Sequence, residues 1–267
     1  MKVISFINLK GGVGKTALAV NFAAYCGLSD YKTLLIDLDP QTNASFCSIG
    51  VGGWERHSTE KGTVANILKS RSHTDARGIV KTAAEVIYKD AFKNVDLLPS
   101  HIDLFTVDLD LSNAVSRELL LKKGLRPIME DYDIIVCDCP PNLTLPTQNA
   151  LAISNYYVIP VSLDFLSAIG VGLLINRVKE LSDDLENQLT NAGIILSRVG
   201  RPAVHREQTE ATIRDQFKGD VLDQYIKERS VVSECAEKNI SIFASSNDDA
   251  KDEFTAAFSE IFQRVGL

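Results

Sequence analysis

Short apolar runs that are rich in β-branched residues alternate along the chain with longer amphipathic stretches. The apolar runs cover residues 3–8, 33–37, 95–98, 133–138, 156–161 and 192–197. The amphipathic stretches cover residues 14–27, 104–130, 165–181, 204–217 and 248–265. Near-continuous hydrophobic strands linked by helices predict an α/β fold with a mostly parallel, twisted sheet and helices on both of its faces. Because the sequence has no long linker or repeat, residues 1–267 are interpreted as a single doubly wound domain.

Two stretches refine this pattern. Residues 50–62 combine glycines with polar side chains, so we expect a polar surface loop there. In the last helix, Phe254, Phe258, Phe262 and Val265 recur at helical spacing and form one apolar stripe. Helices that bind membranes usually carry Lys and Arg on the opposite face, whereas acidic residues dominate here. The stripe is therefore predicted to pack on the sheet.

Composition and charge narrow the possible classes of protein. Hydrophobic residues make up 45% of the chain, charged residues make up 24%, and the net charge is −7. These values are typical of a globular protein and argue against a wholly basic nucleic-acid binder, although they leave room for a local basic patch. Residues 1–10 do not have the features of a secretory signal, and no apolar run is long enough to span a bilayer. We therefore expect a cytoplasmic protein without membrane insertion.

The five cysteines are scattered and odd in number, which is typical of a reducing compartment. Cys137 and Cys139 flank Asp138 and have the spacing of a metal-binding pair. No further Cys/His cluster lies nearby in the sequence, so both are interpreted as buried or loop thiols.

A glycine-rich segment follows the first predicted strand and opens the first predicted helix. Residues 10–16 read KGGVGKT. Glycines allow successive backbone N–H groups to surround phosphates, and the helix N-terminus favours negative charge. Lys15 is expected to reach the β- and γ-phosphates, and the hydroxyl of Thr16 is expected to bind Mg²⁺. The residues predicted to bind nucleotide here are Gly11, Gly12, Val13, Gly14, Lys15, Thr16 and Ala17.

Acidic residues end two further predicted strands. Asp37 and Asp39 leave the strand at 33–37 before Pro40 ends it, and Asp138 ends the strand at 133–138. Each of these two acidic motifs, taken alone, is consistent with a solvated strand end. Beside a phosphate loop, however, one carboxylate of the first pair suits Mg²⁺ and the other suits a water molecule, while Asp138 matches a Walker B aspartate that holds Mg²⁺. All of these motifs follow strands, so we expect them to meet at the carboxyl edge of the sheet.

Taken together and in order, three segments resemble the motifs of ParA-type partition ATPases, the deviant Walker A class of the ParA/MinD superfamily. They are KGGVGKT at 10–16, LLIDLDPQTNAS at 34–45 and YDIIVCDCPP at 132–141. The resemblance extends to LLPS at 97–100 and covers nearly the whole chain. It implies a P-loop NTPase fold, ATP and Mg²⁺ as cofactors, and a homodimer that encloses ATP between its subunits.

The resemblance also implies roles for individual residues. Lys10 would contact phosphate across the dimer interface and act in trans, as an arginine finger does; the alternative is a loop lysine that only raises the local potential. Gly11 would lie where the subunits meet, so a larger side chain should block pairing. The catalytic residues implied are Lys10, Lys15 and Asp39, and the metal ligands implied are Thr16, Asp37 and Asp138.

The chain departs from the family pattern at two places. Ala17 replaces a second threonine whose hydroxyl would lie near the α-phosphate. The segment at 228–236 also lacks the proline and glycine that the family carries in a region expected to help to bind DNA. Ser197, at the end of the predicted strand at 192–197, is a candidate neighbour of the adenine.

The basic residues between 198 and 238 are candidates for a DNA-binding surface. Eight basic residues in this segment are balanced by eight acidic ones, so a solvated helical surface is an equal alternative. A dimer would double any basic patch, and phosphate contacts alone allow sequence-independent binding. The expected DNA contacts are Arg214, Lys218, Lys227 and Arg229.

The leading hypothesis is a slow Mg²⁺-dependent ATPase that dimerises with ATP and then binds DNA non-specifically. A ParB-like or other adaptor would stimulate hydrolysis, and the cycle would position a plasmid, chromosome region or other cargo, with the protein associated with the nucleoid. The alternatives are a MinD-like membrane or scaffold-positioning switch, an iron–sulfur carrier related to nitrogenase reductase, and an ATP-dependent carboxylate ligase.

Overall fold

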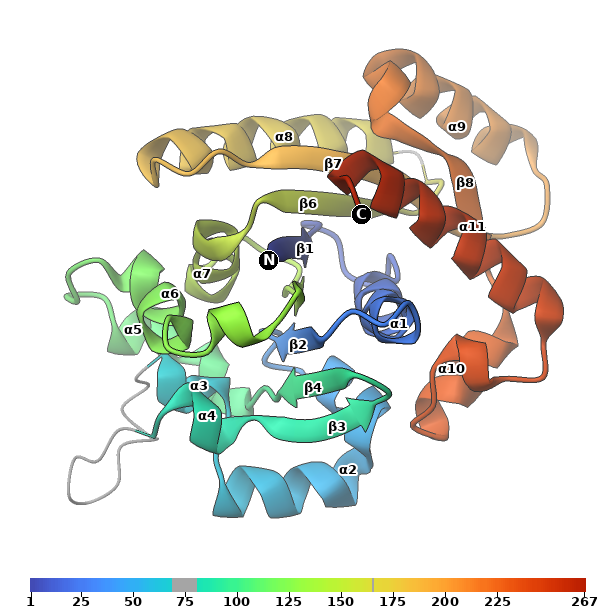
Figure 1. Cartoon of the computed structure of the whole chain (residues 1–267). Coiled ribbons are helices and arrows are strands. Elements are labelled where there is room, and N and C mark those ends of the chain that lie inside the picture. Colours follow the sequence, from blue (N-terminus) through green and yellow to red (C-terminus); the bar gives the residue numbers. More distant parts are fainter. Residues whose placement is uncertain (69–80, 165) are drawn as a thin grey trace.

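The computed structural model describes residues 1–68, 81–164 and 166–267. Eight strands in this part of the chain form one sheet with the order β3-β4-β2-β5-β1-β6-β7-β8 (Figure 1). Neighbouring strands are parallel, except that β3 and β4 are antiparallel. The strands are β1 (Lys2–Phe6), β2 (Thr33–Asp37), β3 (Tyr88–Phe92), β4 (Val95–Leu98), β5 (Ile134–Asp138), β6 (Tyr156–Val161), β7 (Thr190–Val199) and β8 (Val221–Lys227).

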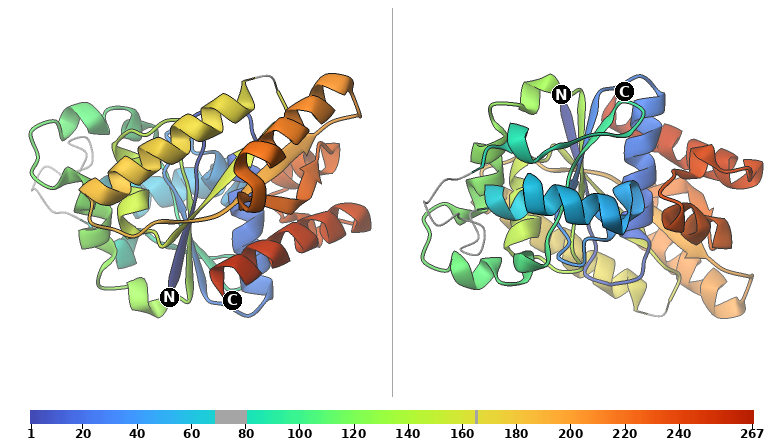
Figure 2. Two further views of the ribbon diagram at one scale, coloured as in Figure 1. Left: turned by 90° about the horizontal axis from the view of Figure 1, so that it is seen from above. Right: turned by 90° about the horizontal axis from the view of Figure 1, so that it is seen from below.

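Helices cover both faces of this sheet, as Figures 1 and 2 show. Their bounds are α1 (Lys15–Leu28), α2 (Asn43–Glu60), α3 (Val64–Ile67), α4 (Ala83–Val86), α5 (Val107–Asp110), α6 (Leu120–Leu125), α7 (Leu145–Ile153), α8 (Ser167–Asp184), α9 (Val204–Phe217), α10 (Ser230–Glu237) and α11 (Asp248–Val265). Short 3₁₀ turns are η2 (Ile102–Phe105), η3 (Arg117–Leu119), η4 (Met129–Asp131), η5 (Lys218–Asp220) and η6 (Ile242–Ala244). The predicted α/β fold with a mostly parallel sheet is confirmed.

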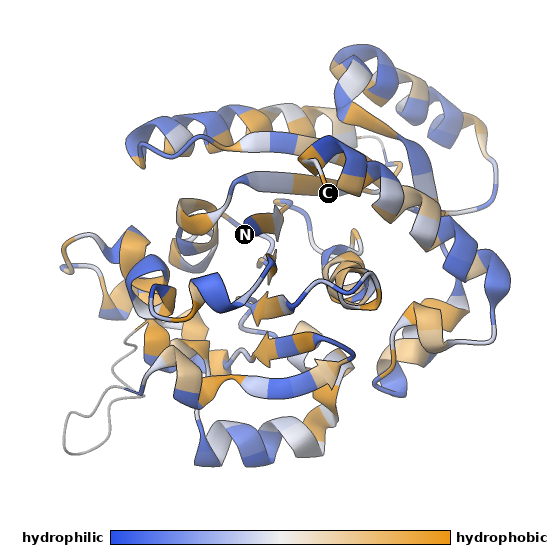
Figure 3. Cartoon of the chain, in the orientation of Figure 1, coloured by the Kyte–Doolittle hydropathy of each residue, from blue (hydrophilic) through white to orange (hydrophobic). Residues whose placement is uncertain are grey.

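Two hydrophobic cores lie on opposite faces of the sheet because side chains alternate along each strand. In β5, Ile134 and Val136 join the core formed with α1 and α11, whereas Ile135 and Cys137 join the core formed with α7 and α8. Figure 3 shows α9 as a mostly hydrophilic helix and α1 as a largely hydrophobic one.

The apolar stripe of the last helix is buried, as predicted. Phe254 and Phe258 are 1% and 0% exposed, and the ring of Phe22 in α1 meets those of Phe258 and Phe262 edge to face at 5.2 and 5.7 Å. The apolar stripe of α11 therefore packs against other parts of the same chain. Among the described residues, no helix combines the length and the apolar character needed to cross a membrane.

The prediction of one helix over residues 104–130 is wrong. The structure has short pieces there, namely η2, α5, η3, α6 and η4. Ser116 adopts a left-handed φ of 53°, and Pro127 cannot continue a helix. The side chain of Asn149 in α7 also donates to the carbonyl of Arg117 and accepts from the N–H of Leu121, so tertiary hydrogen bonds hold the break between the pieces.

The prediction of a polar loop at residues 50–62 is also wrong, because α2 continues to Glu60. Gly50 has non-helical angles (φ 70°, ψ 161°) and marks a kink. Beyond the kink, Trp54 stacks edge to face on Phe46 at 5.2 Å and donates to the carbonyl of Ser100 at 2.9 Å. These contacts hold a helix that glycine content alone argues against.

Strands β3 and β8 were not predicted, because both are edge strands with several polar residues. The other predicted strands and helices agree with the structure to within a few residues. Residue 165, where the predicted helix at 165–181 begins, lies outside the described residues, and α8 starts at Ser167.

Candidate nucleotide-binding site

The glycine-rich loop joins β1 to α1 at the carboxyl edge of the sheet. Gly12 and Gly14 have φ values of 75° and 84°, in the left-handed region that favours glycine. Gly14 is also the N-cap of α1, whose first-turn N–H groups have no partners within the helix. Loop and helix N-terminus together form a suitable place for an anion.

The segment departs from the common G-x-x-x-x-G-K-[ST] pattern at its first position, where the chain has Leu9. The loop that the prediction requires is present nevertheless, between β1 and α1. Its geometry depends on the later glycines, since Gly12 and Gly14 take the left-handed conformation.

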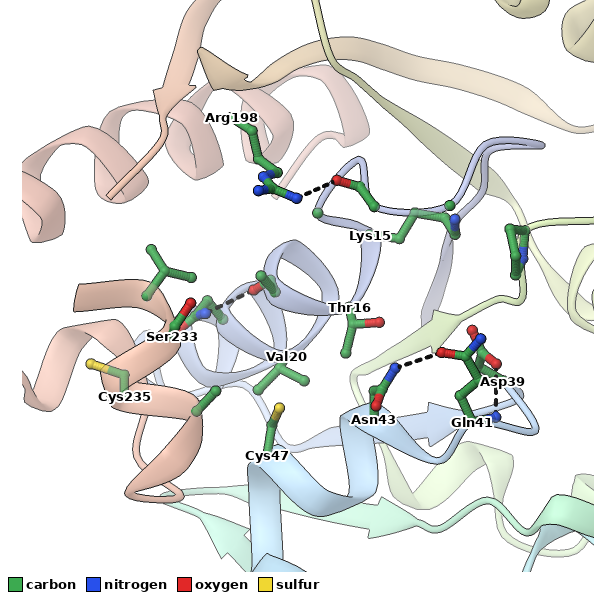
Figure 4. Close-up of a pocket in the computed structure, with 18 of the residues that line it drawn as sticks. Lys15, Thr16, Val20, Asp39, Gln41, Asn43, Cys47, Arg198, Ser233 and Cys235 are labelled. Atoms are coloured by element: carbon green, nitrogen blue, oxygen red, sulfur yellow. Dashed lines mark hydrogen bonds between the residues drawn. The ribbon is translucent and has the colours of Figure 1, made fainter. Parts of the chain in front are cut away.

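A cavity of about 510 Å³ opens beside this loop. Figure 4 shows Lys15 and Thr16 on one side of it and Asp39, Gln41 and Asn43 on another. Six of the predicted nucleotide-binding residues line it, namely Gly11, Gly12, Gly14, Lys15, Thr16 and Ala17. Val13 is buried instead, at 1% exposure, and contributes its carbonyl to a hydrogen bond with Ser197.

Lys15 is a buried cation at this cavity. Its side chain donates to the carbonyl of Lys10 at 3.0 Å. Burial lowers the pKa of Lys15, whereas the negative charges of Asp138 and Asp39 raise it. An ammonium group beside two carboxylates and the helix N-terminus is well placed to meet a phosphate, which is the role predicted for it.

Asp37 and Asp138 end neighbouring strands in register with one another and are fully buried. Asp37 accepts hydrogen bonds from the N–H and hydroxyl of Ser45 at 2.8 and 2.7 Å, and from the N–H of Asp39 at 3.1 Å. Burial nevertheless raises the pKa of Asp37 to about 7. The two carboxyl groups thus lie side by side, close to Lys15, Thr16 and Asp39, which line the cavity.

Asp138 has the more unusual surroundings of the two. Neither of its carboxylate oxygens has a hydrogen-bond partner among the described residues. Burial and the nearby Asp37 raise its pKa well above the usual value, while the close Thr16 hydroxyl and Lys15 lower it by less. A buried carboxylate without partners, together with Asp37 and Thr16, forms an all-oxygen donor set that fits Mg²⁺, which completes its shell with water and phosphate oxygens.

These buried carboxyl groups predict a pH-dependent effect of Asp138→Asn on stability without nucleotide or Mg²⁺. Because the pKa values of both carboxyl groups are raised, the folded chain holds these protons more tightly than the unfolded chain does. The folded state therefore loses stability as the pH rises and the groups ionise. For Asp37 this loss falls between about pH 4 and pH 7. Asparagine removes one charge, so the gain in melting temperature should be larger at pH 8 than at pH 5. Thermal melts alongside Asp252→Asn, an exposed control, check this. An equal gain at both pH values would contradict it.

Asp39 lies at the cavity, 6% exposed, and its position is fixed from both sides. Its carboxylate accepts from the N–H of Gln41 at 2.9 Å, and its carbonyl accepts from the hydroxyl of Ser100 at 2.6 Å. Ser100 is itself held in place, because its N–H donates to the Ser45 hydroxyl at 3.0 Å. The LLPS segment therefore holds the loop that carries Asp39, whose predicted role with water stays a prediction.

Lys10 differs from the rest of the loop. Its ammonium group pairs with the carboxylate of Asp164, just after β6, and its side chain is 52% exposed. Burial raises the pKa of Asp164, but hydrogen bonds from Lys10 and Ser162 outweigh it and lower the pKa. Lys10 thus offers its carbonyl to Lys15 and turns its charge toward Asp164 at the surface.

Several residues at the cavity were missed by the sequence analysis. Residues of α10 close one side, and Cys47 and Arg198 contribute from α2 and β7. The missed residues include Gln41, Asn43, Cys47, Arg198, Val232, Ser233, Cys235 and Ala236. Gln41 and Asn43 lie within the quoted second motif, but nothing in the local sequence marks the others.

Most of the predicted DNA contacts are paired with other groups of the chain. Arg214 binds Glu210 at 2.8 Å and the Leu222 carbonyl at 3.0 Å. Arg229 and Lys227 both face Glu253, at 3.1 and 3.9 Å. Lys218 is exposed at the end of α9. Their role in binding DNA stays a prediction.

The cysteines do not form a metal centre in the described part of the chain. Cys137 and Cys139 are fully buried, and burial raises the pKa of Cys137 to about 12 and that of Cys139 well above its usual value. No group of three or more His, Cys, Asp and Glu side chains that could hold a metal occurs among the described residues.

Comparisons with known proteins agree with this geometry. A family profile described as an AAA domain matches residues 1–191. The chromosome partitioning protein ParA of Myxococcus xanthus is 30% identical over 234 residues, which cover 88% of this chain and 78% of that protein. The sporulation initiation inhibitor protein Soj of Bacillus subtilis is 31% identical over 233 residues, which cover 87% of each.

A solved structure of a putative plasmid partition protein from Borrelia burgdorferi, bound to AMPPNP, superposes with a TM-score of 0.78. It is 25% identical and covers 99% of both chains. Fold and site together define a P-loop ATPase. The chain belongs to the ParA-type partition ATPases of the ParA/MinD superfamily.

Proposed function

We propose that this protein is an Mg²⁺-dependent ATPase switch that dimerises around ATP and positions a cargo on DNA. The observation that carries the proposal is the placement of Lys10. It sits in the phosphate loop, yet its charge pairs with Asp164 at the surface instead of turning into the cavity that Lys15 lines. A half-exposed lysine at this edge is available to the nucleotide of a second copy, much as an arginine finger is supplied in trans.

Within each subunit, different residues bind the phosphates, the Mg²⁺ ion and the attacking water. The loop N–H groups and Lys15 hold the phosphates, while Thr16, Asp37 and Asp138 would hold Mg²⁺, which neutralises the developing charge. Asp39 orients the attacking water, and Lys10 of the other subunit completes the site. Because the full arrangement forms only in the dimer, intrinsic turnover is slow and a ParB-like or other adaptor stimulates it.

In the ATP-bound dimer the basic residues near β8 and α9 bind DNA without regard to sequence, so the protein works in the cytoplasm on the nucleoid. The test is DNA binding with ATP, ADP or a slowly hydrolysed analogue. We expect binding only with ATP or the analogue, and more weakly at higher salt. If the protein does not bind DNA in any nucleotide state, the proposed role on DNA is wrong.

Gly11→Val should block dimerisation while leaving ATP binding by the monomer within a few-fold of wild type. A Cβ at Gly11 would meet no described atom of the same chain within 4 Å, so the substitution fits the nucleotide-free subunit, and the two assays separate a clash with the second copy from a clash with the nucleotide. Sedimentation with the slowly hydrolysed analogue, and binding of a fluorescent ATP, separate the two properties. A dimer of normal affinity would remove Gly11 from the interface.

Arg214→Glu should weaken binding to any DNA sequence and flatten its salt dependence, by about one unit of slope if one phosphate contact per site is lost. Because Arg214 also bonds Glu210 and the Leu222 carbonyl, folding must be monitored by the melting temperature. Arg177→Glu, in α8 and exposed, is a matched control. An unchanged slope in a folded Arg214→Glu protein would exclude Arg214 as a DNA contact.

No described feature favours the MinD-like membrane alternative, because the aromatic stripe of α11 packs on α1 and the sheet. A positioning switch on a protein scaffold would share every step except the contact with DNA.

A further inference from the structure

Strand β7 ends against the phosphate loop and supplies two hydrogen-bond donors to it. The hydroxyl of Ser197 donates to the carbonyl of Val13 at 2.5 Å, and Nη1 of Arg198 donates to the carbonyl of Gly12 at 2.8 Å. Figure 4 shows the second of these bonds. Neither residue belongs to the loop sequence, yet together they bond two successive carbonyls of it.

These bonds fix the direction of the loop amides. In a planar trans peptide the N–H points opposite to the carbonyl. The carbonyls of Gly12 and Val13 point toward β7, so the N–H groups of Val13 and Gly14 point away from it. A loop that cradles phosphate needs its N–H groups turned together in one direction.

Arg198 is itself held in place by an unusual set of constraints. Its φ of 52° is in the left-handed region, which costs a residue other than glycine about 1 kcal/mol. Its Nη2 donates to the carboxylate of Glu228 at 2.6 Å, and the N–H of Glu228 in turn donates to the carbonyl of Val199 at 3.0 Å. The guanidinium is thus fixed between the phosphate loop and the end of β8.

We propose that Arg198 is a positioning residue that holds the phosphate loop in its nucleotide-binding form, with Ser197 beside it and Glu228 orienting its guanidinium. The inference rests on the nucleotide binding in the proposed function and is independent of DNA. The ligand class it serves is a nucleoside di- or triphosphate, because the amides concerned bind phosphates that ATP and ADP share.

The test is to measure ATP and ADP affinity in Arg198→Ala, Arg198→Lys and Arg201→Ala with fluorescent nucleotides. We expect Arg198→Ala to raise both dissociation constants by about tenfold and by the same factor, as loss of a hydrogen bond from a charged donor would. Lysine should restore part of the affinity, since it can reach one acceptor but lacks the planar fork that bridges two. Arg201→Ala, an exposed change three residues along, should have no effect.

Two further measurements distinguish a positioning role of Arg198 from a general structural role. The melting temperature of nucleotide-free Arg198→Ala should match wild type within a few degrees, because the side chain is 53% exposed. At saturating ATP, turnover should return to near the wild-type value, so that KM rises while kcat changes little. A large fall in melting temperature, or a loss in kcat at constant KM, would contradict positioning.

Unchanged ATP and ADP affinities in Arg198→Ala would overturn the inference, and so would a loss confined to ATP, which would indicate direct contact with the γ-phosphate. Failure of the proposed function looks different. A wild-type protein that binds ATP but never DNA contradicts the role on DNA and leaves the role of Arg198 standing.

Discussion

Lys15→Ala is expected to lower ATP turnover by about 10³-fold and to remove most of the affinity for ATP and ADP. Lys15 is 6% exposed, lies beside Asp138 and Asp39, and lines the cavity with the loop glycines. A charge in such a desolvated site acts far more strongly on a phosphate than a charge in water does. Binding of a fluorescent nucleotide and steady-state hydrolysis measure the two losses.

Lys179→Ala is a suitable control for this change, because Lys179 is exposed on α8 away from the cavity. Removing the cation also leaves two buried carboxylates with less compensation, so the nucleotide-free protein must be shown to fold by its melting curve. A folded Lys15→Ala protein that binds ATP with wild-type affinity would contradict the assignment of this cavity.

Lys10→Ala should leave the affinity of the monomer for ATP nearly unchanged, yet lower turnover in the dimer by about 10³-fold, the lower range for a finger supplied in trans. The reason is geometric, since the ammonium of Lys10 pairs with Asp164 and its side chain is 52% exposed. Loss of ATP binding and turnover together would instead indicate a role within the same subunit. Binding and hydrolysis are measured separately.

Asp164→Asn is the matched change on the other side of this pair. It should release Lys10 and favour the ATP-bound dimer, but only by a few-fold, because half-exposed ion pairs contribute about 0–1 kcal/mol. Sedimentation with the slowly hydrolysed ATP analogue gives the change in dimer affinity. A dimer weakened as strongly as in Lys10→Ala would show that Asp164 has another role at the interface.

The interior strands of the sheet and the edge at which the site lies could be predicted from the sequence, because both depend on local pattern. Strands at 33–37, 95–98 and 156–161 are nearly continuous apolar runs, and their bounds match those of β2, β4 and β6. Acidic residues that directly follow such runs must meet at one edge of a parallel sheet. Asp37 and Asp138 do so, in register.

The remaining features depend on contacts between distant residues. The helix after Gly50 is held by Trp54, and the break near Ser116 is held by Asn149 in another helix. Edge strand β8 reads VLDQYIK and has no continuous apolar run. Likewise, the pairing of Lys10 with Asp164 joins residues 154 positions apart, and no local pattern indicates it.

The most direct test of the central claim is to mix two inactive variants, Lys10→Ala and Asp39→Ala, and measure ATP hydrolysis. In a mixed dimer, the Lys10→Ala subunit keeps its own Asp39 and receives Lys10 from its partner, so one of the two sites is complete. Because half of the dimers in an equal mixture are mixed, turnover should recover to about a quarter of the wild-type value. If the mixture stays as inactive as each variant alone, Lys10 does not act across the interface, and the proposed ATP sandwich is wrong.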